Sequence, residues 1–246
     1  MKKLLRVSMM AVLVAGLTGL VALAQQPRPG GGGFTGQGGP TSLIRSKTVM
    51  ADVKITDDQA KKLSEWAKDY QAKNQETMKA KFGEFKDLPR EEMAKKFAEF
   101  QGEQSKEAYK QIGTVLEAGQ VKRLQQIEVQ VAGTRAFGMK SVQDALKITD
   151  DQKTKLAEIG EASRKESTEL RDEYGIKGFG GAKIDADKMK EYTKKNDGIT
   201  AATMMKIKSV LSDDQKKSWS DLTGDKIDVA KIQEEGRAAF TRKKDD

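Results

Sequence analysis

The sequence predicts an all-α protein made of two tandem copies of one helical unit. From residue 43 to the C-terminus the chain is rich in Lys, Glu, Gln, Ala and Met, and Pro89 is its single proline. These residue types favour helices, and alternating β-branched residues are scarce, so we expect no sheet. A seven-residue motif that begins at Val53 returns at Leu146, which indicates a duplicated unit.

The repeat has two recognisable parts. The segment VKITDDQ (Val53–Gln59) recurs as LKITDDQ (Leu146–Gln152), 93 residues later. The segment VLEAGQ (Val115–Gln120) recurs more loosely as VLSDDQ (Val210–Gln215), 95 residues later. Because both segments recur in the same order and at nearly the same offset, we infer that a whole unit was duplicated.

Each of these segments predicts the start of a helix. A hydroxyl residue followed three residues later by Gln, just before an apolar-periodic run, forms a capping box: the hydroxyl accepts from the backbone amide of the Gln, and the Gln side chain reaches back. Glu117 replaces the hydroxyl residue in one copy, so we expect that cap to be the weakest. The predicted cap residues are Thr56, Gln59, Gln120, Thr149, Gln152, Ser212 and Gln215.

Each unit is expected to contain a long helix that begins at the first motif, a second long helix, and a short third helix that begins at the second motif. Apolar residues form a helical stripe along the middle helix, and turns are predicted at 83–89 and 175–181. Such turns fold the two long helices into an antiparallel hairpin. The predicted boundaries are 43–138 for the first unit, 139–224 for the second, and 225–246 for a C-terminal helix and charged tail.

Residues 1–24 have the pattern of a cleavable secretory signal. Three basic residues within the first six positions precede an apolar run that ends in a small-residue cleavage site. The run is shorter than the roughly 20 residues that span a membrane. We therefore expect cleavage near Ala24–Gln25, no membrane insertion afterwards, and a periplasmic or secreted protein. Residues 25–42, rich in Gly and Pro, predict a disordered linker.

The composition excludes disulfides and histidine-based metal or catalytic sites. The chain has no cysteine and no histidine. Without cysteine it has no disulfide, so we expect its stability to come from packing, and we expect no lipid anchor. Without histidine it lacks the commonest metal ligand and the commonest general base near neutral pH. The formal charge of +8 falls to +5 when the three basic residues of the leader are removed. The remaining charges of both signs alternate along the helices, so no nucleic-acid partner is expected.

No pattern of an active site is present, and we expect no catalytic residue, no cofactor and no enzyme activity. The glycines at 30–33 precede no strand and no Lys-Ser/Thr pair, so they are not a phosphate-binding loop. Two acidic clusters lack the glycine and the terminal glutamate of a calcium-binding loop, and helix capping explains them better, so no metal site is predicted. The clusters are Asp185, Asp187 and Glu191, and Asp221, Asp225 and Asp228.

Four phenylalanines flank the turn of the first predicted hairpin. They form either an apolar patch that binds a polypeptide or a staple that closes the turn. The apolar stripe of an amphipathic helix is usually buried, which favours the staple. A thin helical protein has little interior, which favours exposure of some rings and polypeptide binding. The four are Phe82, Phe85, Phe97 and Phe100.

The motifs resemble those of the Spy/CpxP family of periplasmic stress-response proteins, which carry LTxxQ-like motifs in pairs. The versions here, roughly 60 residues apart within a unit, end at Gln59 and Gln152 (both close), Gln215 (looser) and Gln120 (degenerate). The resemblance covers about residues 45–224. It implies an extended, cradle-like bundle of antiparallel hairpins, which that family forms from two chains and which the tandem units would form within one. Metal responses through histidine are not implied, because this chain has none.

The resemblance implies a periplasmic, ATP-independent chaperone-like protein or an envelope-stress adaptor. We predict that it binds unfolded or partner polypeptides in an apolar groove between its hairpins, and a homodimer is compatible with this prediction. One alternative is a non-catalytic structural or scaffolding protein of the envelope. A second alternative is an envelope calcium sensor, in which the acidic clusters would bind the metal.

Overall fold

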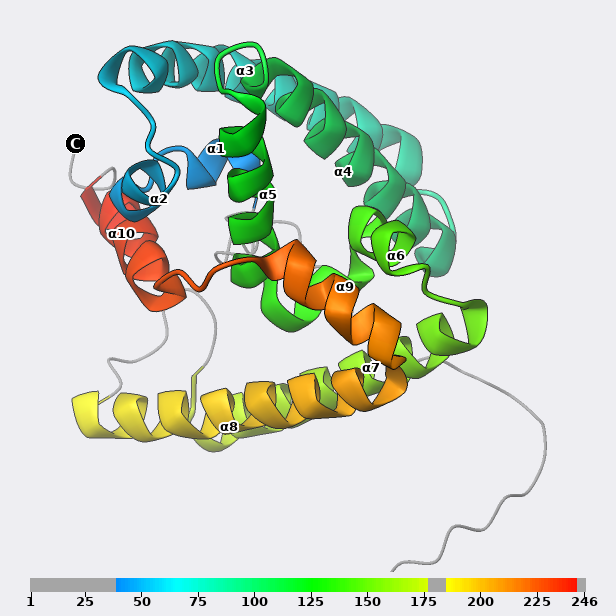
Figure 1. The fold of residues 1–246 in the computed structure, drawn as a ribbon. Coiled ribbons are helices and arrows are strands. Elements are labelled where there is room, and N and C mark those ends of the chain that lie inside the picture. Colours follow the sequence, from blue (N-terminus) through cyan, green and yellow to red (C-terminus); the bar gives the residue numbers. More distant parts are fainter. Residues whose placement is uncertain (1–38, 177–184, 243–246) are drawn as a thin grey trace, which may run out of the picture.

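The computed structural model describes residues 39–176 and 185–242 (Figure 1). In these two ranges the chain forms α-helices and a 3₁₀ helix, η1, without strands, so the predicted all-α class is confirmed. The elements are α1 (Pro40–Leu43), α2 (Lys47–Asp52), α3 (Asp57–Phe85), α4 (Arg90–Ile112), α5 (Ala118–Ala132), η1 (Gly133–Gly138), α6 (Lys140–Leu146), α7 (Asp150–Glu173), α8 (Ala186–Val210), α9 (Asp213–Thr223) and α10 (Val229–Arg242).

The first helix among the described residues overlaps the end of the predicted linker. The linker was expected to extend to residue 42, whereas α1 contains Pro40–Leu43. Pro40 is the first helical residue, where the missing amide costs no hydrogen bond, and Leu43 and Ile44 are buried. These apolar side chains draw the segment into the core, so the linker ends before Pro40. The predicted signal and the rest of the linker up to residue 38 lie outside the described residues.

The same backbone geometry leads into both KITDDQ motifs. Lys54 and Lys147 adopt the left-handed conformation, with φ of 57° and 51°, at the ends of α2 and α6. The next amide, that of Ile55 or Ile148, donates to a carbonyl five residues earlier, at 2.9 and 3.0 Å. This is the long hydrogen bond of a Schellman motif, so each long helix is preceded by the same short helix and turn.

The internal repeat is longer than its two motifs indicate. Four buried apolar positions from α1 to the end of α2 have buried counterparts 93 residues later, in η1 and α6. Because η1 corresponds to the start of the first unit, the second unit begins near Gly133 and not after residue 138. The corresponding pairs are Leu43 and Ala136, Ile44 and Phe137, Val49 and Val142, and Val53 and Leu146.

In the first unit, α3 and α4 lie side by side (Figure 1). Tyr70 donates to the carbonyl of Gln104 at 2.9 Å, and nearer the turn the rings of Phe82 and Phe97 lie 6.4 Å apart. The contacts therefore run in opposite order along the two helices. α3 continues beyond the first glycine of the predicted turn, and the connection is the short segment 86–89.

In the second unit, α7 and α8 also lie side by side and antiparallel (Figure 1). Thr203 donates to Ser163 at 2.9 Å, and Lys195 lies 3.4 Å from Glu173 near the end of α7. The second predicted turn, 175–181, begins just after α7 ends at Glu173. Its residues 177–181 lie outside the described residues. Figure 1 shows the two helix pairs on opposite sides of the molecule, with α5 and α9 between them.

The third helices of the two units, α5 and α9, hold the units together. Three side chains of α5 donate to backbone carbonyls at the C-terminal end of α9 and just after it. The two units therefore pack on each other and are not independent domains. The pairs are Arg123 Nη1 with Asp225 at 2.8 Å, Gln126 Nε2 with Asp221 at 3.0 Å, and Gln130 Nε2 with Thr223 at 2.7 Å.

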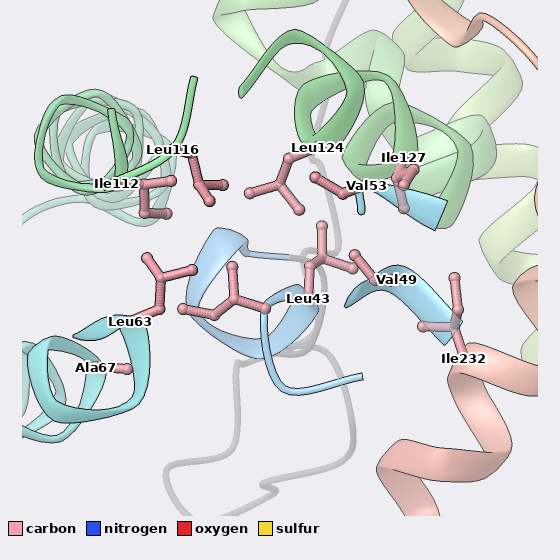
Figure 2. Packing of buried hydrophobic residues seen from close by; sticks show 11 residues of the cluster. Leu43, Val49, Val53, Leu63, Ala67, Ile112, Leu116, Leu124, Ile127 and Ile232 are labelled. Atoms are coloured by element: carbon pink, nitrogen blue, oxygen red, sulfur yellow. The ribbon is translucent and has the colours of Figure 1, made fainter. Parts of the chain in front are cut away.

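Two apolar clusters form the core. The first draws side chains from α1, α2, α3, the end of α4, α5 and α10 (Figure 2). The second lies among η1, α6, α7, α8 and α9, and in it Phe137 stacks on Trp219 with 4.3 Å between ring centroids. α5 serves both clusters, because it supplies Leu124 to the first and Val129 to the second.

The C-terminal helix α10, predicted as part of a separate tail, returns to the start of the fold. Ile232 lies in the first cluster beside side chains of α2 and α5 (Figure 2). Glu235 accepts from Ser46 Oγ at 2.5 Å, from Thr48 Oγ1 at 2.8 Å and from the Thr48 amide at 3.2 Å. Because Ser46 is the N-cap of α2, this carboxylate lies at the positive end of that helix.

Candidate functional site

The glutamines of the two motifs in the first unit bind each other. Gln59 Nε2 donates to Gln120 Oε1 at 2.9 Å, and Gln120 Nε2 donates back to Gln59 Oε1 at 3.2 Å. Each amide also binds the turn before the partner's helix: Gln59 donates to the Val115 carbonyl at 3.2 Å, and Gln120 to the Lys54 carbonyl at 2.9 Å. The pair therefore joins the starts of α3 and α5.

The second unit repeats this arrangement. Gln152 donates to Gln215 at 2.7 Å, and Gln215 donates back at 2.9 Å. Gln152 also binds the Val210 carbonyl at 2.9 Å, and Gln215 the Leu146 carbonyl at 3.1 Å. Sequence reasoning placed these glutamines in separate helix caps and missed that the two motifs of a unit meet. The similar spacing of the glutamines, 61 residues in the first unit and 63 in the second, was the available signal.

The same glutamines close the helix starts. Thr56, Thr149 and Ser212 are the N-caps of α3, α7 and α9, and their hydroxyls accept from the amide three residues later at 3.2–3.3 Å. Each Gln Oε1 accepts in return from the cap residue's backbone amide at 2.9–3.1 Å. At the fourth position the Glu117 amide donates to Gln120 at 3.0 Å. Every motif glutamine thus serves a local cap and a long-range contact at once.

The four phenylalanines do not form one exposed patch. Phe85 and Phe100 are buried, and Phe85 meets Phe97 edge-on with 5.2 Å between ring centroids. Phe97 is half-buried, whereas Phe82 keeps 46% of its surface exposed. Of the two alternatives, the staple fits Phe85 and Phe100 and an exposed binding patch does not, because both side chains are buried. Phe82 is the member most available to a partner.

One residue of each acidic cluster caps a helix. Asp185 accepts from the amide of Asp187 at 2.9 Å, and Asp228 accepts from that of Lys231 at 2.9 Å. Across residues 39–176 and 185–242, no group of three or more acidic side chains is placed to hold a metal ion. Asp225 instead uses its backbone carbonyl, which accepts from α5.

A buried acid was not found from the sequence. Glu128 on α5 is 7% exposed, and its Oε2 accepts from the hydroxyl of Tyr109 at 2.8 Å. Burial raises the pKa of Glu128 to about 7, although the hydrogen bond from Tyr109 opposes the rise. Burial also raises the pKa of Tyr109, and the nearby carboxylate adds to this effect. The signal in the sequence was one acid between Ile127 and Val129 on an apolar face.

No protein-family model matches this chain, and comparisons with curated proteins and with solved structures found no match. The resemblance to the Spy/CpxP family therefore rests on the motifs alone. In the described part of the chain, no helix combines the length and the apolar character needed to cross a membrane.

Proposed function

We propose that this chain is a non-catalytic protein of the bacterial cell envelope that binds unfolded or partner polypeptides without ATP. The observation that carries the proposal is how little of the long helices is buried. Three of the 29 residues of α3, two of the 24 of α7 and two of the 25 of α8 are buried. The other residues of these helices are half-buried or exposed. Little of each helix therefore lies in a core, and the outward faces are available to another chain.

Large apolar side chains stand on these free surfaces. Phe82 on α3 is exposed, and on α8 Met189 and Met205 are exposed, Met205 by 67%. Methionine adapts its shape to different partners, and the stems of neighbouring lysines add apolar area around a charged tip. Flexible side chains of this kind suit a partner without a fixed shape better than a rigid pocket does.

The envelope location and the chaperone-like role are supported by the sequence. The basic and apolar pattern of residues 1–24 favours export, and the motifs resemble those of a family of periplasmic stress-response proteins. A chain without histidine lacks the commonest general base near neutral pH, which favours binding over catalysis.

Suppression of aggregation without ATP tests the proposal. A chemically unfolded client protein is diluted with and without substoichiometric amounts of this protein, and light scattering is followed. Phe82→Ser should weaken suppression several-fold while the protein stays folded with a small decrease in melting temperature, since 46% of the Phe82 surface is exposed. Gln75→Ser, at an exposed polar position on the same helix, is the control and should leave suppression intact.

Two results would contradict parts of this proposal. Unchanged scattering with several different clients would reject polypeptide binding and favour the scaffold alternative. Full suppression by the Phe82→Ser variant would show that clients bind elsewhere. Substitution of Phe100 does not test the surface, because this buried ring contributes to folding.

A further inference from the structure

A groove runs between α7 and α8, away from the two core clusters. Its volume is about 490 Å³, and its floor is apolar, with Leu170 from α7 and Ile199 and Ala202 from α8. Glutamates of α7 form one side and Lys195 lies on the other. The full lining is Glu166, Glu169, Leu170, Glu173, Lys195, Gly198, Ile199 and Ala202.

Gly198 opens the groove on the side of α8. It lies in the interior of a 25-residue helix, where glycine costs roughly 1 kcal/mol relative to alanine. A Cβ atom added at this position would meet nothing within 4 Å, so packing of the fold does not require the glycine. The missing side chain leaves space directly above the apolar floor.

The wall formed by α7 carries regularly spaced negative charge. Glu166, Glu169 and Glu173 are exposed and share one face of the helix over about 10 Å of its length. Lys195 partly compensates Glu173 at 3.4 Å, but it also lies 3.6 Å from Glu191. Lys165, one turn earlier on α7 and outside the lining, lies 4.0 Å from Glu169. The eight lining residues therefore carry three negative charges and one positive charge.

We propose that this groove binds a cationic amphipathic helical segment of a partner polypeptide. Lys or Arg residues at the spacing of the three glutamates would face them, and aliphatic side chains of the same helix would cover Ile199 and Leu170. A peptide backbone can approach closely over Gly198 because no side chain stands there. The inference rests on the proposed function and names the class of segment that the second hairpin selects.

The first hairpin lacks this site, although it arose from the same repeat. At the offset of 93 residues, Lys73 and Ala80 stand where α7 has Glu166 and Glu173, and only Glu169 keeps an acidic counterpart, Glu76. At the offset of 95 residues, Glu103 replaces Gly198 and Gln104 replaces Ile199. The acidic wall, the open glycine and the apolar floor thus occur together in the second hairpin and not in the first, which provides an internal control.

A direct binding measurement tests the inference. The probe is a fluorescein-labelled amphipathic peptide of Leu and Lys, about four turns long, titrated with the protein and followed by anisotropy; the comparison is a Leu and Glu peptide of the same pattern. We expect Gly198→Leu, whose Cβ would meet nothing within 4 Å and whose side chain would occupy the groove, to weaken binding at least about ten-fold. The control Gly102→Leu, also without a neighbour within 4 Å but in α4, should bind like the parent.

Charge supplies a second readout that does not depend on filling the groove. The double variant Glu166→Lys and Glu169→Lys should weaken binding of the Lys peptide by about ten-fold and reduce its dependence on salt. Equal affinity for the Glu peptide, or full binding by the Gly198→Leu variant, would overturn the inference. Concentration-dependent self-association abolished by Gly198→Leu would assign the groove to a second copy instead and would also overturn it.

Failure of this inference is separable from failure of the proposed function. If clients are protected from aggregation while the Lys peptide does not bind, the protein binds polypeptides through another surface and the groove is wrongly assigned. If the Lys peptide binds in the groove while no client is protected, the groove is correctly assigned and the chaperone-like role is rejected.

Discussion

Glu128 is an ionisable residue on a buried, otherwise apolar face of α5. It stands on α5 between two buried aliphatic residues, and Tyr109 donates to its carboxylate. At the corresponding place in the second unit, 95 residues later, the chain has Met204 and Thr223, which carry no charge. An acid of this kind makes the first unit sensitive to pH, and the second unit lacks the same pair.

The expected effect of pH has a defined sign. The pKa of Glu128 is about 7 in the folded protein, against an ordinary value of 4.5, so below pH 4.5 the group is protonated in both states and costs nothing. As pH rises from 4.5 to 7 the unfolded chain loses its proton first, and stability falls by up to about 3 kcal/mol. Glu128→Gln should therefore match the parent at pH 4 and exceed its free energy of unfolding at pH 8.

Urea unfolding between pH 4 and 8 measures this difference. Gln keeps an oxygen that accepts from Tyr109, so the comparison isolates the charge. A constant difference between variant and parent across the whole range would mean that Glu128 does not titrate there.

At the scale of elements, the paired glutamines connect helices that are far apart in the chain. Each pair joins the start of a long helix to the start of the third helix of its unit, through hydrogen bonds between side chains and to backbone carbonyls. A motif that caps one helix thereby also sets the distance to another. The same four segments thus specify both where helices begin and which beginnings meet.

A double-mutant cycle tests the second role. Gln152→Ala should lower the free energy of unfolding by about 2 kcal/mol, because it removes the hydrogen bonds of the Gln152 side chain to Gln215, to the Val210 carbonyl and from the Thr149 amide. The pair Gln152→Ala and Gln215→Ala should show a coupling of about 1 kcal/mol. Gln152→Ala combined with Gln120→Ala is the control and should be additive, since these residues belong to different pairs. If the losses of unfolding free energy were additive in both combinations, the motif glutamines would act only as local helix caps.

At the scale of the whole molecule, two long-range connections make one body of the duplicated units. α5 and α9 join through side chains that donate to backbone carbonyls, and α10 packs against α2 at the opposite end of the sequence. Burial favours a raised pKa for Glu235, but hydrogen bonds from Ser46 and Thr48 outweigh it and the pKa is lowered. Its contribution to stability is therefore present near neutral pH and lost as pH falls through the lowered pKa.

Removal of the Glu235 carboxylate should weaken the packing of α10 against α2. Glu235→Ala is expected to lower stability at pH 7 by about 1–2 kcal/mol, the range for loss of a helix cap, and to speed amide exchange in α10 and α2. Glu234→Ala, at an exposed neighbouring position, serves as the control. Equal exchange rates in α10 for both variants would show that Ile232 and the apolar cluster alone hold the helix.

The sequence by itself determined the helical class, the starts of the long helices and the duplication. These features depend on local physics: the hydroxyl of Thr56 or Thr149 meets an amide three residues away, whatever the rest of the chain does. Amphipathic spacing likewise predicts that a helix forms before its neighbour is known. The capping role of Asp185 and Asp228 also follows from position alone.

Only the tertiary structure decided which surfaces meet. The pairing of Gln59 with Gln120, the return of α10 to α2 and the burial of Glu128 each join residues from separate helices, and helical spacing does not specify the partner of a face. The same reason explains why Phe82 is exposed and Phe100 is buried. Both lie on apolar stripes, and the way the two helices pack decides which ring is covered. Long-range contacts depend on the whole chain, whereas caps depend on four residues.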